Sequence, residues 1–330
     1  MKIAIVKLSA LGDIIHSMVV LQFIKKHNRD IQIDWVVEKN YKELLEGHPD
    51  INKVHIVNLN SAKKKKSIYL LFKELKRVVK FGSYDLVIDM QGLVKSAIIS
   101  KLIPSKITLG FHKSSIRESF ASVFYNKTFK CGYEKNVIDR NFLITKFALE
   151  FSFTKEVIIN KKPFLYSNHE YSQKNLTNKK KNILLVPGAS HASKLYPVKK
   201  FAEITKLTDA NFLVIWGNQD EKKLANEIKS LSSHVNISDK LSLDALISLI
   251  SNVDLVIGGD TGPTHFAWAL NIPSITIFGP TPGYRNSYTT NINKVINSNS
   301  IVNPLKIDKK DYSIRDIGVN KILKLVEGLI

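Results

Sequence analysis

Short β-branched runs alternate with helical patterns along this chain, and the alternation starts twice. The strand-like runs of the first half are KIAIVK, IQIDWVV, KVHIVN, YDLVIDM and ITLGF; those of the second half are NILLVP, NFLVIW, VNI, VDLVIG and SITIFG. Between the runs, apolar residues recur at helical spacing, as at Ile14, Met18 and Leu21 and again at Leu71, Leu75 and Val78. This alternation predicts an α/β chain with two parallel sheets covered by helices.

A polar, lysine-rich stretch separates the two halves. It reads KKPFLYSNHEYSQKNLTNKKKN and places a linker near residues 162 to 181. A length of 330 residues exceeds one ordinary core, so we predict domains over residues 1–165 and 166–330. The last segment, 317–330, has apolar residues at helical spacing and no strand after it. It could pack on either domain, including back on the N-terminal one.

Composition narrows the class of protein. The single Cys131 excludes a disulfide framework and indicates a reducing compartment. No leader and no long apolar run is found, so we expect a soluble, cytoplasmic protein. The net charge of +20 favours an anionic partner, although a solvated lysine-rich surface explains it equally well. Nucleic acid is the weaker option, because no nucleic-acid-binding motif is present.

The first strand-like run feeds a short loop and a helix in the sequence KLSALGDIIHS. Asp13 follows Gly12 at this junction, where α/β proteins usually bind phosphate, so its negative charge needs an explanation. One interpretation is a helix N-cap. The other is a general base, since a carboxylate beside a phosphate site can accept a proton from an attacking hydroxyl. The residues alone leave both open.

A second junction follows the run VDLVIG and reads GGDTGPTHFAWAL over residues 258 to 270. Glycines permit close backbone approach, and a helix N-terminus binds phosphate oxygens through free N–H groups and its dipole. His265 would lie in the first helical turn and could add a donor. The alternative is an ordinary helix start with Asp260 or Thr261 as N-cap.

Several common motifs are absent from the sequence. No Asp-x-Asp pair is present to hold a metal-bound diphosphate, and no GxxxxGK[ST] or GxGxxG is found. We therefore expect no metal and no cofactor. A bound diphosphate would be neutralised by a helix dipole, by His265 and by cations such as Lys194.

Taken together and in order, KLSALGDIIHS, DWVVEKNY, YDLVIDMQGLVKSA, SIRESFASVFYNK, SKLYP, GGDTGPTHFAWAL and FGPT resemble the ADP-heptose:lipopolysaccharide heptosyltransferases of glycosyltransferase family 9, most closely the heptosyltransferase I branch. The resemblance implies the GT-B architecture, two Rossmann-like domains with parallel sheets facing a central cleft. The acceptor would bind the N-terminal domain and the nucleotide-sugar the C-terminal one.

The resemblance also implies an activity. It is inverting, metal-independent transfer of L-glycero-D-manno-heptose from ADP-heptose to the first Kdo of Kdo2-lipid A. Such an enzyme would work as a peripheral protein at the cytoplasmic face of the inner membrane, against an anionic membrane surface. Alternatives are heptosyltransferase II or another nucleotide-sugar transferase. A non-catalytic basic adaptor that binds lipopolysaccharide or nucleic acid is a further alternative.

The family's functional residues carry over by position. Asp13 matches the catalytic base, and Lys194 matches a lysine that contacts donor phosphate. The diphosphate and sugar loop corresponds to Asp260, Thr261, Gly262 and His265. Looser matches place Ser190 at the phosphate, Glu221 at the ribose and Leu241 against adenine.

The sequence departs from the family pattern at three places. Ala189 stands where a second hydroxyl is expected, Pro263-Thr264 replaces a small apolar pair, and the segment from Pro282 after FGPT is short. These departures concern the sugar end of the donor site and leave Asp13 and Lys194 unaffected.

Four consecutive lysines, Lys63, Lys64, Lys65 and Lys66, fall between KVHIVN and the next helical pattern. One interpretation is a solvated loop. The other is an acceptor contact, since the family carries basic residues in this region and Kdo carboxylates and lipid A phosphates are anionic. Arg117, in SIRESF, could join the acceptor site or form a structural ion pair near Glu118.

Overall fold

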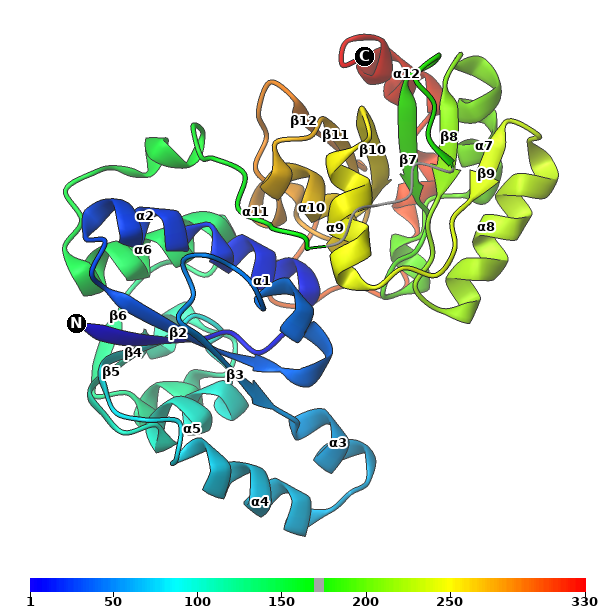
Figure 1. The fold of residues 1–330 in the computed structure, drawn as a ribbon. Helices are drawn as coiled ribbons and strands as arrows, with labels where there is room; N and C mark the ends of the chain where they lie inside the picture. The colour runs from blue at the N-terminus through cyan, green and yellow to red at the C-terminus, as the bar shows by residue number, and fades with distance from the viewer. Residues whose placement is uncertain (169–174) are drawn as a thin grey trace. The chain divides into compact units, whose positions relative to one another are not determined.

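The computed structural model describes residues 1–168 and 175–330. Contacts divide the chain into Met1–Phe164 and Leu165–Ile330. Part of the predicted linker, residues 169–174, lies outside the described residues. Each unit contains one six-stranded sheet, and every strand pairing is parallel (Figure 1).

The first sheet has the strand order β3-β2-β1-β4-β5-β6. Its strands are β1 (Lys2–Val6), β2 (Gln32–Glu38), β3 (Lys53–Val57), β4 (Tyr84–Asp89), β5 (Ser105–Phe111) and β6 (Lys127–Phe129). The second sheet has the order β12-β11-β10-β7-β8-β9. Its strands are β7 (Asn182–Val186), β8 (Asn211–Val214), β9 (Val235–Ile237), β10 (Leu255–Gly259), β11 (Ser274–Phe278) and β12 (Asn293–Asn297).

Numbered within its own unit, each sheet has the Rossmann order 3-2-1-4-5-6. The strand order therefore reverses between β1 and β4 in the first unit and between β7 and β10 in the second. Ligands of open parallel sheets bind at the carboxyl ends of strands beside such a reversal. The predicted α/β class with two parallel sheets is confirmed.

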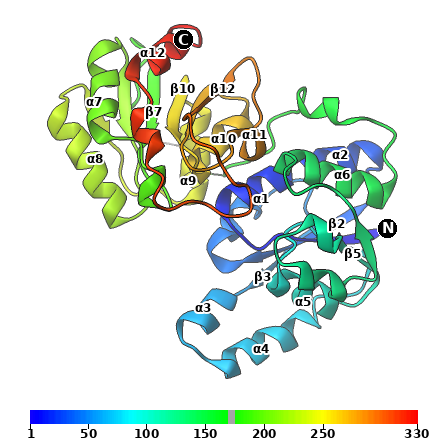
Figure 2. The ribbon, with the colours of Figure 1, turned by 180° about the vertical axis from the view of Figure 1, so that it is seen from behind.

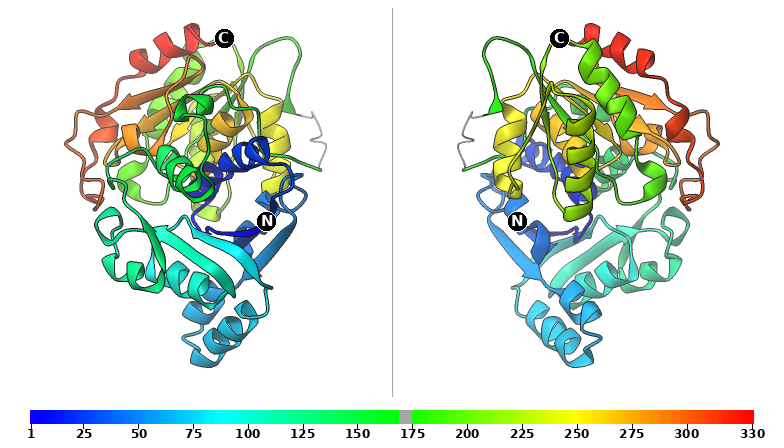
Figure 3. Two further views of the ribbon diagram at one scale, coloured as in Figure 1. Left: turned by 90° about the vertical axis from the view of Figure 1, so that its left-hand side faces the viewer. Right: turned by 90° about the vertical axis from the view of Figure 1, so that its right-hand side faces the viewer.

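Helices cover both faces of the first sheet (Figure 1, Figure 3). One face carries α1 (Leu11–Met18), α2 (Val20–His27) and α6 (Val137–Leu149); the other carries α3 (Leu59–Lys64), α4 (Ile68–Val78) and α5 (Val94–Leu102). The core on the side of α4 and α5 includes Val6, Val87 and Ile99, all at most 1% exposed.

The helices of the second unit form two packed groups (Figure 2). One group contains α7 (Val198–Leu207), α8 (Gln219–Leu231) and α12 (Val319–Glu327). The other contains α9 (Leu243–Ser251) and α10 (Gly262–Leu270), and the short α11 (Gly283–Asn286) contacts β12. The final helix, whose position the sequence left open, belongs to the second unit. There Ile322 and Val326 enter the core beside α7.

The sequence patterns found five strands in each half, and the structure adds the edge strands β6 and β12. Among the described residues, no helix has the length and apolarity needed to cross a membrane.

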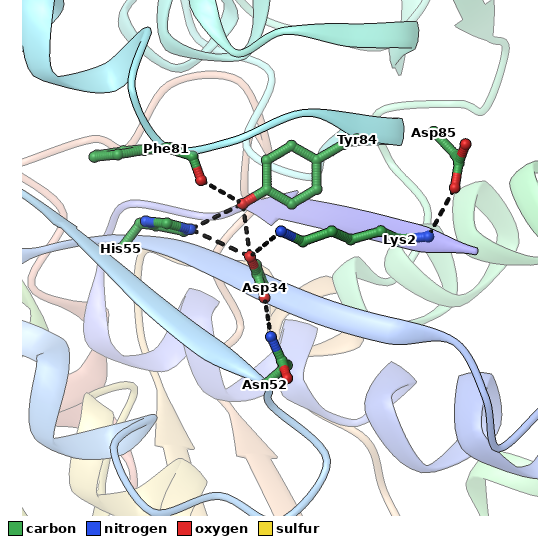
Figure 4. Close-up of polar contacts among 7 residues, drawn as sticks. All are labelled: Lys2, Asp34, Asn52, His55, Phe81, Tyr84 and Asp85. Carbon is green, nitrogen blue, oxygen red and sulfur yellow. Dashed lines mark hydrogen bonds and ion pairs between the residues drawn. The ribbon is translucent and has the colours of Figure 1, made fainter.

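A buried polar cluster ties the amino-terminal parts of four strands of the first sheet together (Figure 4). Its centre is Asp34 of β2, which is fully buried. The Tyr84 hydroxyl donates to Asp34 Oδ2 at 2.6 Å, and the Asn52 amide donates to Oδ1 at 3.0 Å. His55 Nε2 lies 3.3 Å from Oδ2, and the Lys2 ammonium lies 3.5 Å from it.

Burial alone would raise the pKa of Asp34. Hydrogen bonds from His55, Tyr84 and Asn52, together with the charge of Lys2, outweigh burial and hold that pKa below its usual range. Asp34 is therefore an ionised carboxylate inside the sheet, and its partners belong to the strands or directly adjoin them.

Candidate active site

The second unit gathers polar groups at the carboxyl ends of the two strands that flank its reversal. Asp260 directly follows β10, and Lys194 ends a short 3-10 helix, Ala192–Lys194, in the segment after β7. Asp260 Oδ2 lies 2.7 Å from the Lys194 ammonium, and Oδ1 lies 3.2 Å from His265 Nε2. The Thr281 hydroxyl donates to Oδ2 at 2.9 Å. Three of the predicted donor-site residues thus form one cluster.

The charge state of this cluster follows from its partners. Burial raises the pKa of Asp260, but the Lys194 charge and the hydrogen bond from His265 outweigh it and hold the pKa well below the usual range. Asp260 is therefore ionised. An ammonium has three N–H donors, and one of them accounts for the contact with Asp260, so Lys194 can also donate to an anionic ligand.

The N-terminus of α10 lies against the same cluster. Thr261 is its N-cap residue but forms no side-chain cap hydrogen bond, and Pro263 stands in the first turn. A side chain at Gly258 could not fit, because a Cβ there would come within 2.7 Å of Val186 Cβ and 2.8 Å of Thr264 Oγ1. The glycine therefore lets the helix start pack tightly against the sheet, leaving first-turn N–H groups to bind an anion.

Glu221 lies in a separate part of the same unit, in the first turn of α8. Its Oε2 accepts a 2.6 Å hydrogen bond from the Gly217 N–H, while the Asn218 side chain caps the helix. A pocket of about 270 Å³ is lined by Ala189, Leu195, Asn218, Gln219, Asp220, Glu221 and Leu224. The pocket thus unites the segment after β7 with the start of α8.

Two further residues were predicted to bind the donor, Ser190 and Leu241. Ser190 is exposed, and Leu241 is half-buried just before α9. Among the described residues, no hydrogen bond or ion pair joins either side chain to the Asp260 cluster. Ser193, which the sequence analysis did not select, is 1% exposed, and its hydroxyl has no hydrogen-bond partner within the described part of the chain. It adjoins Lys194.

Thr281 is also a residue that sequence reasoning missed. It ends the motif FGPT after β11, so its position beyond the carboxyl end of a strand that neighbours β10 was the available signal. Its hydroxyl shares Asp260 Oδ2 with Lys194.

In the first unit, Asp13 lies in the first turn of α1 and is exposed. The N-cap residue is Ala10, so the interpretation of Asp13 as N-cap is wrong. Asp13 is instead the third helical residue, and its Oδ2 accepts a 3.3 Å hydrogen bond from the Ala10 N–H. The exposed carboxylate keeps acceptor capacity beyond that contact.

The loop that delivers Asp13 is held from β4. Gln91 Oε1 accepts from the N–H groups of Leu8 and Ser9 at 2.8 and 3.3 Å, and Gln91 Nε2 donates to Ser9 Oγ at 3.2 Å. Lys95 donates to the same hydroxyl at 3.2 Å. Asp89, fully buried at the end of β4, accepts from the Gln91 N–H at 2.8 Å. These contacts tie the loop after β1 to the segment after β4, and β1 and β4 are the two strands that flank the reversal.

Two of the four lysines are helical, and the other two lie in the turn that follows, so the solvated-loop interpretation holds for only part of the run. Lys63 and Lys64 form the last turn of α3, Lys65 is the C-cap, and Lys66 adopts φ 48° in the turn to α4. All four are exposed. Arg117 is 56% exposed and lies 3.9 Å from the Glu118 carboxylate, so it forms a loose surface ion pair.

Comparison with known proteins decides the family. The sequence model of glycosyltransferase family 9 (heptosyltransferase) matches residues 72–311. This chain belongs to glycosyltransferase family 9. It is therefore a glycosyltransferase.

Relatives of this family 9 enzyme match nearly its full length. It is 42% identical to lipopolysaccharide heptosyltransferase 1 of Campylobacter coli, over 100% of this chain and 99% of the relative. It is 26% identical to lipopolysaccharide heptosyltransferase 1 of Escherichia coli K12, over 88% of this chain and 92% of the relative. The solved structure of E. coli heptosyltransferase WaaC with ADP-2-deoxy-2-fluoro heptose superposes with a TM-score of 0.79 at 22% identity, covering 99% of each chain. That superposition supports the predicted GT-B fold.

Proposed function

We propose that this family 9 enzyme transfers L-glycero-D-manno-heptose from ADP-heptose to the first Kdo of Kdo2-lipid A, with inversion and without a metal ion. The observation that carries the donor half is the cluster of Lys194, Asp260 and His265 beside the start of α10. A lysine, an imidazole and free helix N–H groups match a diphosphate in charge and geometry. The full-length similarity to proteins named lipopolysaccharide heptosyltransferase 1 carries the choice of sugar and acceptor.

The donor occupies the second unit in this proposal. Lys194, the N–H groups at Thr261 and Gly262, and His265 hold the diphosphate. Ser190 adds a hydroxyl to the phosphates, Glu221 accepts a hydrogen bond from the ribose, and Leu241 packs on adenine. Asp260 orients Lys194 and His265 through its two carboxylate oxygens.

The chemical step is a single displacement. The acceptor hydroxyl attacks the anomeric carbon from the face opposite the diphosphate while the bond from that carbon to ADP breaks. Asp13 takes the hydroxyl proton. Lys194 and the start of α10 stabilise the negative charge that grows on the departing ADP, and this contact strengthens toward the transition state.

The donor-site chemistry supports the proposal of metal independence. The sequence offers no Asp-x-Asp pair, and the groups of the Asp260 cluster that would face a diphosphate are cationic or N–H donors. In enzymes that use a divalent ion, the ion carries that positive charge. Here the protein's own cations take that role.

The acceptor binds the first unit in this proposal. Lys63, Lys64, Lys65 and Lys66 at the end of α3, with Arg117, meet the carboxylates of Kdo and the phosphates of lipid A. Because the acceptor is a membrane lipid, the enzyme works as a peripheral protein on the cytoplasmic face of the inner membrane.

The decisive experiment incubates purified protein with ADP-heptose and Kdo2-lipid A and identifies the product by mass spectrometry. The expected product carries one added heptose, and its yield is the same with excess EDTA as without it. Loss of transfer in EDTA that Mg²⁺ restores would contradict metal independence. Transfer only to an acceptor that already bears one heptose would instead indicate heptosyltransferase II activity.

The acceptor assignment has its own arm. Changing Lys63, Lys64, Lys65 and Lys66 together to Ser should raise the KM for acceptor and weaken its salt dependence, with ADP affinity unchanged. An unchanged acceptor KM would mean that the four lysines form only a solvated helix end and do not bind the acceptor.

A further inference from the structure

Helix α4 presents large apolar side chains to solvent although it already has a core-facing side. Ile68 is 71% exposed, Tyr69 74% and Phe72 59%. At 100° per residue, these three fall within about a third of the helix circumference. Val79, the C-cap residue, continues the same stripe and is 47% exposed.

The opposite side of α4 is the one that packs. Val78 is fully buried, Leu75 packs on the core of the first unit, and Glu74 accepts a 3.0 Å hydrogen bond from the Asn58 N–H. Leu71, which shares the helical spacing of Leu75 and Val78, is 40% exposed. The stripe of Ile68, Tyr69, Phe72 and Val79 is therefore not needed to hold the helix on the sheet. We call it, with Lys73, Lys76 and Lys80, the α4 patch.

The charge around this stripe has one sign. Between residues 59 and 80 the sequence has eight basic residues and one acidic residue, and the acidic one is Glu74 on the packed side. Lys73, Lys76 and Lys80 are exposed, and no ion pair among the described residues involves them. The lysines of α3 continue this basic surface, because α3 and α4 pack as a hairpin.

We propose that the α4 patch docks on an anionic phospholipid bilayer, with Ile68, Tyr69 and Phe72 entering the boundary between headgroups and acyl chains. Lysines on one flank then meet lipid phosphates. Apolar side chains with a basic flank are the two signals that hold a helix in the plane of a membrane. The inference rests on the proposed function only in that the acceptor is a membrane lipid.

Other occupants fit the patch less well. A second copy of the chain would bring one basic surface against another, which repels. Nucleic acid would match the lysines but leave Ile68 and Phe72 without a role. An anionic bilayer complements both features.

The test is cosedimentation of full-length protein with lipid vesicles that contain no acceptor. Wild-type protein should bind vesicles of phosphatidylcholine and phosphatidylglycerol and bind pure phosphatidylcholine far more weakly. Ile68→Ser with Phe72→Ser should lower the partition coefficient on the order of a hundredfold, because two large apolar side chains no longer leave water. The matched control is Leu207→Ser with Ile301→Ser, which removes two exposed apolar side chains from the second unit and should bind like the parent.

A charge arm separates the two signals. Lys73→Ser, Lys76→Ser and Lys80→Ser together should weaken binding to anionic vesicles about a hundredfold. The control triple Lys306→Ser, Lys309→Ser and Lys310→Ser makes the same change in net charge on the second unit and should have little effect. Equal losses in both triples would overturn the patch, because they would show a response to net charge alone.

Transfer to a water-soluble Kdo acceptor without acyl chains keeps this proposal separate from the proposed function. The Ile68→Ser, Phe72→Ser variant should keep wild-type turnover in that assay. Its melting temperature should also match that of the wild-type protein. Wild-type protein that transfers heptose yet ignores anionic vesicles overturns the docking surface and leaves the function intact. Protein that binds vesicles through the patch but never transfers heptose overturns the proposed function and leaves the docking surface intact. Two other outcomes would assign the patch to a different occupant if the protein does not bind vesicles. Self-association that is lost on changing Ile68 and Phe72 would indicate a second copy of the chain. Oligonucleotide binding that is lost on changing the lysines would indicate nucleic acid.

Discussion

Asp34 and Asp260 are both buried aspartates that pair with a lysine and a histidine, and they lie at opposite ends of parallel strands. Asp34 meets Lys2 at 3.5 Å and His55 at 3.3 Å in the amino-terminal part of its sheet (Figure 4). Asp260 meets Lys194 at 2.7 Å and His265 at 3.2 Å just beyond the carboxyl end of β10. Both carboxyl groups have a lowered pKa. An ion cluster by itself therefore does not identify a binding site.

The difference lies in where the partners come from. The partners of Asp34 are held within strands or next to them, so the cluster joins strands of one sheet. Those of Asp260 come from the ends of separate loops and from the first turn of α10, beside the reversal of strand order. Ligands of open parallel sheets bind beyond the carboxyl ends of the strands, so the groups around Asp260 are placed to contact a ligand and those around Asp34 are not. We infer that the Asp34 cluster stabilises the first unit and the Asp260 cluster serves the donor.

The largest effect should come from the carboxyl end of the first sheet, at Asp13. Asp13→Asn keeps the size of the side chain and can still accept the Ala10 N–H. It cannot take a proton, so kcat should fall about 10²- to 10⁴-fold, the range of a positioned general base. Steady-state transfer assays with ADP-heptose and Kdo2-lipid A measure this. ADP affinity and melting temperature should match the parent. A variant that folds, binds ADP and turns over within a few-fold of the parent would show that Asp13 serves only the helix start.

At the amino end of the same sheet, Asp34→Asn should affect stability instead of catalysis. It removes the charge that pairs with Lys2 and His55, which should cost about 3 kcal/mol, the lower part of the range for a broken buried pair. Lys2 is 35% exposed and can return to water, which limits the loss. Urea unfolding reports the change.

Asp85 offers a matched control for that variant. It lies beside the cluster and accepts the Lys2 backbone N–H at 2.8 Å (Figure 4). It also pairs with exposed Lys106. Asp85→Asn should shift unfolding much less than Asp34→Asn, because surface pairs contribute little. If Asp34→Asn lowered kcat or ADP affinity in protein that remains folded, the division between the two strand ends would be wrong.

The smallest expected effect is the pH dependence of the stability that Asp34 contributes, which acid unfolding measures. The pKa of Asp34 is lower in the folded protein than in the unfolded chain, so its stabilisation is complete above the ordinary pKa and is lost as the pH falls toward the folded value. The difference in melting temperature between parent and Asp34→Asn should be constant from pH 7 to about 5 and narrow below about pH 4. A difference that stays constant down to pH 3 would mean that Asp34 is not held as a paired carboxylate.

The central strands could be predicted from the sequence, because their runs are apolar and buried on both faces, but their order in the sheets could not. Two of the four edge strands, β6 and β12, could not be predicted. β6 has three residues, all of them partly or fully exposed, and β12 is the polar sequence NKVIN. Edge strands lack a second neighbour to bury them, so their pattern is weak.

Single members of the Asp260 cluster were predictable where a motif carries them, as for Asp260 and His265 in GGDTGPTH. Contacts between motifs were not, since Lys194 and Thr281 meet at Asp260 only after the strands are paired. Asp34 had a usable signal in IQIDWVV, where a carboxylate interrupts an apolar run. Such a residue needs buried partners, but the sequence does not say which ones.

Binding of ADP to two matched lysine variants tests the central claim, that the carboxyl-end cluster is the donor site, most directly. Lys194→Gln and Lys2→Gln each remove an ammonium paired with a buried aspartate. Titration calorimetry should show ADP affinity about 10- to 100-fold weaker for Lys194→Gln, the loss expected for hydrogen bonds to a charged group, and unchanged for Lys2→Gln. Equal affinities in Lys194→Gln and the parent, with both proteins folded, would contradict the assignment of the Asp260 cluster to the donor.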